Sequence, residues 1–360
     1  MPENLFTSNV PIFLVDGERQ GALARDVIRL EIEEDYYGMK RLAARFTAWG
    51  PLEQGADEGE LYLDGNIFDF GKQLDITIGP ASNARTVFKG TITAIEAVYV
   101  EGHEPQVVVC AEDELMKLRM THRMRTYEGV TDTDIVQQIA SEHGLNAECD
   151  AEGPAHAVVQ QWNISDLAFL RERARLLQAE LWFQDGTLYF KTRNNRQGTE
   201  LTLVNGNHLI SLQARADLAH QRSSINVSGY QIEERDLIDE QAEASSLASE
   251  LEGGRSGLSV LSDAFGDYGS FRTREVPFNP ETARYWAKAE LLRRARQFVR
   301  IFGLTRGSPD MVVGSRVQLQ RVAAPFSGGG YYVTKVVQSY DLIEGHRTKF
   351  EAERPILEAS

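Results

Sequence analysis

The sequence predicts a mainly β protein with an α+β insert, and three observations support this fold class. The first hundred residues contain short segments of alternating polar and apolar side chains and no long helical pattern. Two amphipathic helix patterns and a hairpin signal then interrupt the β pattern. Strand patterns return afterwards and continue to the end of the chain, with one long helix among them. A chain of 360 residues is long enough for two or three domains.

Residues 1–111 form the first predicted block, which consists of β-strands. In the segment DVIRLEIEED, Ile28, Leu30 and Ile32 alternate with charged residues. This period of two is typical of a strand with one solvent-facing side. Further strand patterns follow in the segments RLAARFTAW, QLDITIG, TVFKGTITAIEAVYV and PQVVVCAED. Short strands separated by turn residues indicate an antiparallel barrel or a sandwich.

Residues 112–197 form the second predicted block, an α/β insert that begins with a short helix. The helix lies within TYEGVTDTDIVQQIASEHGL, and Thr131 or Thr133 can cap its start. Gly144 stands where a left-handed residue commonly ends a helix. The sequence therefore predicts both ends of this helix.

A second helix of the insert lies in QWNISDLAFLRERARLLQAELWFQDGTLYF. Ser165 is its expected N-cap, and Asp166 follows at the first helical position, where a negative charge favours the helix dipole. Leu170 and Leu177 belong to its apolar face. Asp185-Gly186 then predicts a two-residue hairpin turn.

Residues 198–234 and 312–360 form a second predicted β block, which residues 235–311 interrupt. Residues 236–269 are rich in Ser, Ala, Glu and Gly. Their first half is compatible with a polar helix, and their second half predicts a mobile loop or a segment that a partner orders. The segment PETARYWAKAELLRRARQFVRIFGL predicts the longest helix, which begins at Pro280 and ends at Gly303.

Charge and cysteine content exclude several classes of protein. The formal net charge of -15 argues against non-specific nucleic-acid binding and against docking on anionic lipid, since both require a basic surface. Cys110 and Cys149 are too few for a disulfide framework, so we expect folding in a reducing compartment. No stretch approaches the roughly 18 consecutive apolar residues that a membrane helix requires.

A search for catalytic and ligand-binding patterns finds none. The histidines show no HxxH or HExxH spacing. The run Glu33-Glu34-Asp35 resembles a source of paired carboxylates, but its place at a strand end predicts a solvated turn. The glycine-rich SGGGYY leads into a strand and lacks the Lys-Ser/Thr of a phosphate loop. We therefore expect no enzyme activity, no catalytic residue, no cofactor and no bound metal.

Two groups of charged residues are candidates for a subunit or partner interface. One lies on the polar face of the second insert helix, and the other lies in the basic stretch RRARQFVR of the long helix. A solvated helix face is the ordinary interpretation of both, but an acidic protein can also use a basic helix to contact acidic neighbours. The candidate residues are Arg171, Glu172, Arg175, Arg293, Arg294 and Arg296.

The tryptophans bear on a carbohydrate-binding or receptor-binding role, which would require exposed aromatic side chains. The four residues are Trp49, Trp162, Trp182 and Trp286. Most of them lie inside periodic segments that predict burial, which disfavours such a role.

Four segments, taken in order, resemble the phage late control protein D family. These are baseplate hub proteins of contractile tails, and they are related to the hub portion of VgrG spike proteins. The segments are FKGTITAIEAVY, TDTDIVQQIASEHGL, VVQQWNISDLAFLRERARLLQAELWFQDGTLYF, and GSRVQLQRV with GGYYVTKVVQSYDLIEGHRTKFEAER. The chain departs from the family pattern at Gln338, where the family often has histidine, and in residues 236–269, which have no counterpart.

The resemblance implies a fold and an assembly. Residues 1–111, and residues 198–234 with 312–360, would form two tube-like antiparallel β-barrels, with the α/β insert at 112–197. Three chains would form a ring of six barrels that adapts the sixfold tail tube to the threefold spike. Because the chain ends at Ser360, where VgrG chains continue into a needle, we expect the spike to be a separate protein.

The expected partners are further copies of the chain in a homotrimer, the tail tube protein, the spike and other baseplate proteins. Nucleic acid would only pass through the lumen, and no membrane insertion is expected. The protein would lie in the bacterial cytoplasm during assembly and then in the baseplate of a virion or injection particle. The alternatives are a tail-tip cell-wall hydrolase and a carbohydrate-binding or receptor-binding tail module.

Overall fold

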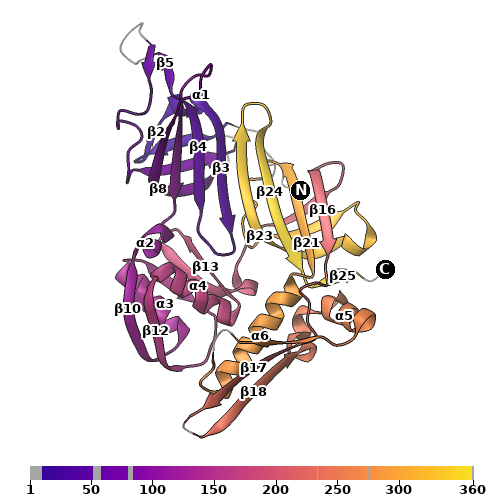
Figure 1. The fold of residues 1–360 in the computed structure, drawn as a ribbon. Coiled ribbons are helices and arrows are strands. Elements are labelled where there is room, and N and C mark those ends of the chain that lie inside the picture. The colour runs from indigo at the N-terminus through magenta and orange to yellow at the C-terminus, as the bar shows by residue number, and fades with distance from the viewer. Residues whose placement is uncertain (1–9, 52–57, 80–83, 233, 274–275, 359–360) are drawn as a thin grey trace.

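The computed structural model describes residues 10–51, 58–79, 84–232, 234–273 and 276–358. Their buried apolar side chains gather into separate cores, one for each β domain, one for the insert, and one beneath the long helix. Figure 1 shows the two β domains side by side, with the insert below the first and the long helix below the second. The predicted mainly β fold class is confirmed.

The first β domain is an antiparallel sheet wrapped around an apolar core. Alternation in β3 places Leu30 and Ile32 in that core, as the period of two predicts. The sheet has the order β3-β4-β9-β8-β7-β1-β2. Its strands are β1 (Ile12–Val15), β2 (Glu18–Arg19), β3 (Val27–Asp35), β4 (Arg41–Thr47), β7 (Gln73–Ile78), β8 (Arg85–Val98) and β9 (Gln106–Glu112). The smaller elements are helix α1 (Gly21–Asp26) and the hairpin of β5 (Trp49–Pro51) and β6 (Glu58–Glu60).

The second β domain continues the same sheet, because β23 pairs with β3. Register partners such as Val336 with Glu34 and Tyr340 with Leu30 join the two domains edge to edge. The order beyond the junction is β23-β24-β21-β16, and β22 and β15 branch from β23. The strands are β15 (Glu200–Val204), β16 (Leu209–Ala216), β21 (Val299–Arg306), β22 (Arg316–Gln320), β23 (Gly328–Asp341) and β24 (Gly345–Arg354), with the 3-10 turn η3 (Ala324–Phe326).

The insert has the helix ends that its sequence predicts. Thr131 forms a capping box with Asp134 at the start of α3 (Asp132–Glu142), and Gly144 has a φ of +69° after its end. The Ser165 side chain accepts a hydrogen bond from the Ala168 N–H at the start of α4 (Asp166–Leu177). The remaining elements are α2 (Leu115–Met120), β10 (His122–Val130), β11 (Asn146–Cys149), β12 (His156–Ser165), β13 (Ala179–Gln184), β14 (Thr187–Thr192) and the 3-10 turn η1 (Arg193–Asn195).

The predicted hairpin joins β13 and β14. Its turn residues Asp185 and Gly186 have φ angles of 48° and 83°, which is the type I′ geometry that favours Asp-Gly. A further turn at Gly38 in the first β domain packs against this hairpin. A Cβ at Gly38 would lie 1.7 Å from the Leu181 carbonyl oxygen, so only glycine fits there. The first β domain and the insert are therefore in direct backbone contact.

The structure corrects the prediction for residues 236–269, which form regular elements and not a loop. The elements are β18 (Asp236–Glu243), η2 (Ala244–Glu250), β19 (Gly254–Ser256), α5 (Gly257–Phe265) and β20 (Gly269–Arg272), and β19 pairs with β25 (Ile356–Glu358). In β18, Ile238 and Ala242 are buried under the long helix, while Leu237 faces outward. Most residues of this strand are polar, so its sequence did not indicate that one side is buried.

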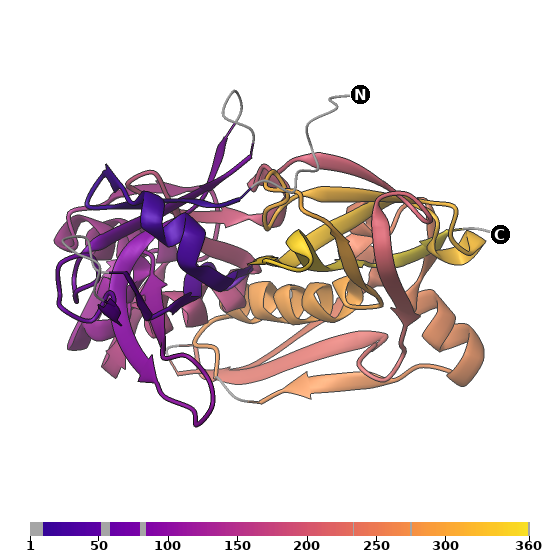
Figure 2. The same ribbon diagram turned by 90° about the horizontal axis from the view of Figure 1, so that it is seen from above.

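The assignment of residues 198–234 to the second β domain was wrong for one strand. Strand β17 (Ser224–Gln231) pairs with β18 and β20 in a separate three-stranded sheet. Helix α6 (Pro280–Arg296) covers one face of this sheet and also contacts β24. Figure 2 shows α6 between the second β domain and the β17–β18 sheet.

The long helix ends at Arg296, and the predicted end at Gly303 was wrong. Val299 and Ile301 are fully buried while Arg300 between them is exposed, which is the alternation of a strand. β-Branched residues favour that conformation. Gly303 lies opposite Phe350 in β24, and the Phe350 ring occupies the space where a Cβ would stand. Residues 299–306 thus belong to the second β domain as β21.

Candidate functional site

A buried ionic cluster joins the first β domain, the insert and the second β domain. Arg196 donates to Glu34 of β3 at 2.6 Å and to Glu180 of β13 at 3.1 Å. Arg193 donates to Glu180 at 3.2 Å and to Glu353 of β24 at 2.8 Å. All five charged side chains are buried. Glu34 is therefore buried, and the prediction that it lies in a solvated turn was wrong. Its partner Arg196 is remote in sequence, so the residues around Glu34 did not indicate this burial.

Glu180 is the central acceptor of this cluster. Burial opposes its ionisation, but the charges of Arg193 and Arg196 and the hydroxyl of Tyr332 hold the pKa of Glu180 below its ordinary value. The guanidinium groups of Arg193 and Arg316 also lie over the Tyr332 ring, at 4.1 and 4.4 Å from its centroid. Such a cluster fixes the orientation of the domains that contribute to it.

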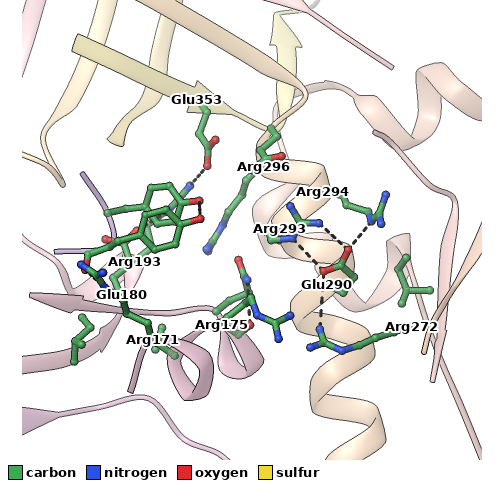
Figure 3. A pocket seen from close by; sticks show the side chains of 18 of the residues that line it. Arg171, Arg175, Glu180, Arg193, Arg272, Glu290, Arg293, Arg294, Arg296 and Glu353 are labelled. Atoms are coloured by element: carbon green, nitrogen blue, oxygen red, sulfur yellow. Dashed lines mark hydrogen bonds and ion pairs between the residues drawn. The ribbon is translucent and has the colours of Figure 1, made fainter. Parts of the chain in front are cut away.

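A cavity of about 430 Å³ lies beside this cluster, where α4 and β13 of the insert face α6, β20 and β24. Figure 3 shows arginine side chains that enter the cavity from both helices. Seven arginines and three glutamates line it, a formal excess of four positive charges in a chain of net charge -15. These residues are Arg171, Arg175, Arg193, Arg272, Arg293, Arg294, Arg296, Glu180, Glu290 and Glu353.

Five of the six predicted interface residues line this one cavity. Arg171 and Arg175 enter from α4, and Arg293, Arg294 and Arg296 enter from α6. Glu172 does not line the cavity and is exposed on α4. Sequence analysis missed the remaining charged lining residues. Glu290 lies on α6 itself, and the others come from strands or from the segment after β14 and show no shared motif.

Two strands of the long sheet, β16 and β8, have a stretch of edge that carries no partner within the described part of the chain. At one end, β16 pairs with β21 alone. On the far side of the first β domain, β8 pairs with β7 only as far as Thr91, and its residues 94–98 pair with β9 alone. Unpaired strand edges bind other strands readily, so these two edges are candidate contacts with further chains.

Two of the four tryptophans are exposed, contrary to the prediction of burial for most of them. Trp162 is 67% exposed on β12, directly opposite the exposed Met124 of β10, and Trp49 is 40% exposed on β5. Trp182 and Trp286 are buried. Trp162 lies in a strand that is covered on one side only, so its periodic context did not imply burial.

Within the described ranges, no group of three or more His, Cys, Asp and Glu side chains is placed to hold a metal ion. No helix in those ranges combines the length and the apolar character that crossing a bilayer demands.

Two curled β domains that share one sheet, with an α/β insert after the first, give the chain the fold of phage tail and VgrG proteins. The 43 kDa tail protein of prophage MuSo2 from Shewanella oneidensis superposes with a TM-score of 0.68 at 13% identity, over 97% of this chain and 99% of that chain. A tail protein from Neisseria meningitidis superposes with a TM-score of 0.64 at 12% identity, over 97% of each chain.

Proteins of type VI secretion have the same fold. The Escherichia coli c3393 protein, a component of the type VI secretion system with structural similarity to the T4 tail proteins gp27 and gp5, gives a TM-score of 0.57 at 16% identity, over 93% of this chain and 74% of that chain. These likenesses confirm the fold that the late control protein D resemblance implies. No curated protein sequence matches the chain. The family described as the Alg8 N-terminal domain matches residues 58–341, and the chain belongs to this family.

Proposed function

We propose that the chain is a structural baseplate hub of a contractile phage tail or of a phage-derived injection particle. The observation that carries this proposal is the eight-strand run β16-β21-β24-β23-β3-β4-β9-β8, which ends in an unpaired stretch at both sides within the described residues. The two halves of the run belong to two different β domains. One chain thus carries two β domains in a single sheet.

The two unpaired edges suit a closed ring of copies. If residues 94–98 of β8 pair with β16 of the next copy, each contact joins two different surfaces, and rotation closes the series. Three copies would contribute six β domains and a continuous ring of strands, which leaves neither of these two edges exposed. Six similar domains in three chains would match a sixfold tube on one side and a threefold spike on the other.

The partners of this proposed hub are the tail tube protein, a separate spike protein and other baseplate proteins. The fold supports this role, because proteins that share it include tail proteins and a VgrG found in a complex with PdpA in Francisella, which matches with a TM-score of 0.54 at 10% identity, over 99% of this chain and 60% of that chain. The protein would be made in the bacterial cytoplasm and incorporated into the particle. No catalytic role is part of the proposal.

The proposed contact is tested with cysteines placed on both edges. In a chain with Cys110→Ser and Cys149→Ser, the pair Ala97→Cys and Gln213→Cys places one thiol on β8 and one on β16. Under mild oxidation or with a short bismaleimide, we expect a ladder of covalent species that ends at the trimer. Each single-cysteine variant is the matched control and should give no trimer, because a closed heterologous contact joins unlike edges. A mass measurement that shows only monomer, with no cross-linked species at micromolar concentration, would contradict the proposal.

A further inference from the structure

We infer that the cavity between α4 and α6 is a binding site for a short acidic peptide segment of another protein. The site is distinct from the sheet edges of the proposed ring, and the inference does not depend on that ring. It rests on the distribution of charged side chains in the cavity and on the ion pairs that these side chains already form.

The positive charge in the cavity is concentrated between the two helices. On the side of α6, Glu290 alone accepts from Arg293 at 2.7 Å and from Arg294 at 2.8 Å, and Arg272 of β20 approaches the same carboxylate at 3.9 Å. Arg175 enters this space from α4 (Figure 3). Arg293 and Arg294 of α6 thus share one carboxylate, that of Glu290.

The deeper arginines do not contribute to this excess. Arg193 is neutralised by Glu180 and Glu353, and Arg296 pairs with Glu250 at 2.6 Å. In the outer part of the cavity, where α4 faces α6, Arg293 and Arg294 share the single carboxylate of Glu290.

Among the described residues, Arg171 forms no ion pair within 4 Å with a carboxylate, and Asp35 and Asp113 act on it only from a greater distance. Its Nε donates to the Tyr37 carbonyl at 2.9 Å, and its guanidinium lies 5.9 Å from the Tyr37 ring centroid. Burial lowers the pKa of Arg171, and the charges of Asp35 and Asp113 offset this effect only in part. A ligand carboxylate at this position would supply the missing counter-charge and could accept two parallel hydrogen bonds from the guanidinium.

Two features favour a peptide over an inorganic anion. Aromatic side chains form part of the lining: Tyr37 is 49% exposed and Phe271 is 70% exposed. Such rings offer contact area to the carbon atoms of a peptide, which a bare phosphate lacks. Glu290 in addition shows how the cluster holds a carboxylate on an aliphatic stem, and a glutamate of a bound segment would repeat that chemistry.

The site is tested by calorimetric titration of the purified full-length protein with acetyl-Glu-Glu-Glu-amide at low ionic strength. We expect saturable binding that weakens as salt is added, because the attraction is electrostatic. Arg171→Gln and Arg293→Gln should each weaken binding at least tenfold. Arg300→Gln is the matched control: this exposed arginine of β21 pairs with Glu351 of β24, outside the cavity, and its loss should leave affinity within twofold.

Two further measurements test whether binding requires the negative charge of the peptide and the planar guanidinium group of Arg171. Acetyl-Gln-Gln-Gln-amide should not bind, since it has the shape of the acidic peptide without its charge. Arg171→Lys keeps the charge but lacks the planar fork, so it should bind with intermediate affinity, and it replaces Arg171→Gln if that variant does not fold. Absence of salt-dependent binding to the wild type, equal affinity in the wild type and both glutamine variants, or binding of tripolyphosphate with none of the acidic peptide would each overturn the inference. These readouts report on the cavity within each chain, whether or not the chains assemble, so failure of the binding test and failure of the cross-linking test are distinguishable.

Discussion

Glu180 illustrates how one side chain can hold three parts of the chain together. Its two carboxylate oxygens accept from Arg193 and Arg196 and from the Tyr332 hydroxyl. The two arginines in turn reach Glu353 in the second β domain and Glu34 in the first. Every member of the cluster is buried. Removal of one charged side chain therefore leaves the charges of its partners uncompensated, because solvent does not replace it.

Glu180→Ala should therefore lower the free energy of unfolding by about 3–5 kcal/mol, since removing one partner of a buried ionic cluster leaves the other charges without an acceptor. Denaturant unfolding followed by tryptophan fluorescence measures the change, and Trp182 on the same strand reports on this region. Glu172→Ala on the exposed side of α4 is the control and should change stability by less than about 0.5 kcal/mol. A loss below about 1 kcal/mol for Glu180→Ala would show that water or rearrangement relieves the buried charges.

The helices of the insert were predictable because their signals are local. Thr131 and Ser165 cap helices by bonding N–H groups three residues ahead, and Asp185-Gly186 needs only its own backbone angles. The end of α6 was not predictable in the same way. Residues 299–304 are as apolar as a helix face, and their strand conformation depends on pairing with β24 and β16, which are remote in sequence.

Helix α4 offers a direct test of such packing. Leu170 is fully buried in the core of the insert, whereas Leu177 at the end of the same helix is only partly buried. Leu170→Ala should cost about 2–5 kcal/mol of unfolding free energy, because the truncation leaves a cavity that the surrounding side chains fill only in part. Leu177→Ala is the matched control with identical chemistry.

We expect Leu177→Ala to cost clearly less than Leu170→Ala, because solvent already reaches that end of the helix. Thermal and denaturant unfolding of both variants, compared with the wild type, gives the two values. Equal costs at the two positions would mean that the last turn of α4 is packed as tightly as its middle.

Several residues of the candidate cavity could be predicted from the sequence, but the cavity that they form together could not. Periodicity placed Arg171 and Arg175 together on the polar face of one helix, and the basic run marked Arg293 and Arg294 on another. Nothing in a single sequence states that these two helix faces meet, because their contact follows from how the insert and α6 pack around the second β domain. Arg272 and Glu290, which complete the charge pattern, became functional candidates only through that contact.

The proposed ring requires backbone hydrogen bonds between β16 and the next copy of the chain. Proline substitutions at two neighbouring residues of β16 test this requirement. Along a strand, successive N–H groups point alternately to its two sides. One of Leu212 and Gln213 therefore donates toward β21, and the other directs its N–H to the edge that has no partner within the described chain. Proline removes the donor and is tolerated in edge strands only when that N–H is not used.

Of Leu212→Pro and Gln213→Pro, we expect one variant to keep the unfolding free energy of the isolated chain within about 1 kcal/mol of the wild type while losing the trimer. The other should destabilise the chain itself by about 3 kcal/mol or more, because it breaks the ladder to β21. Light scattering gives the mass and denaturant unfolding gives the stability, so each variant serves as the control for the other. If the well-folded variant still forms trimers as readily as the wild type, β16 is not the edge through which copies of this chain meet, and the ring must close through another surface.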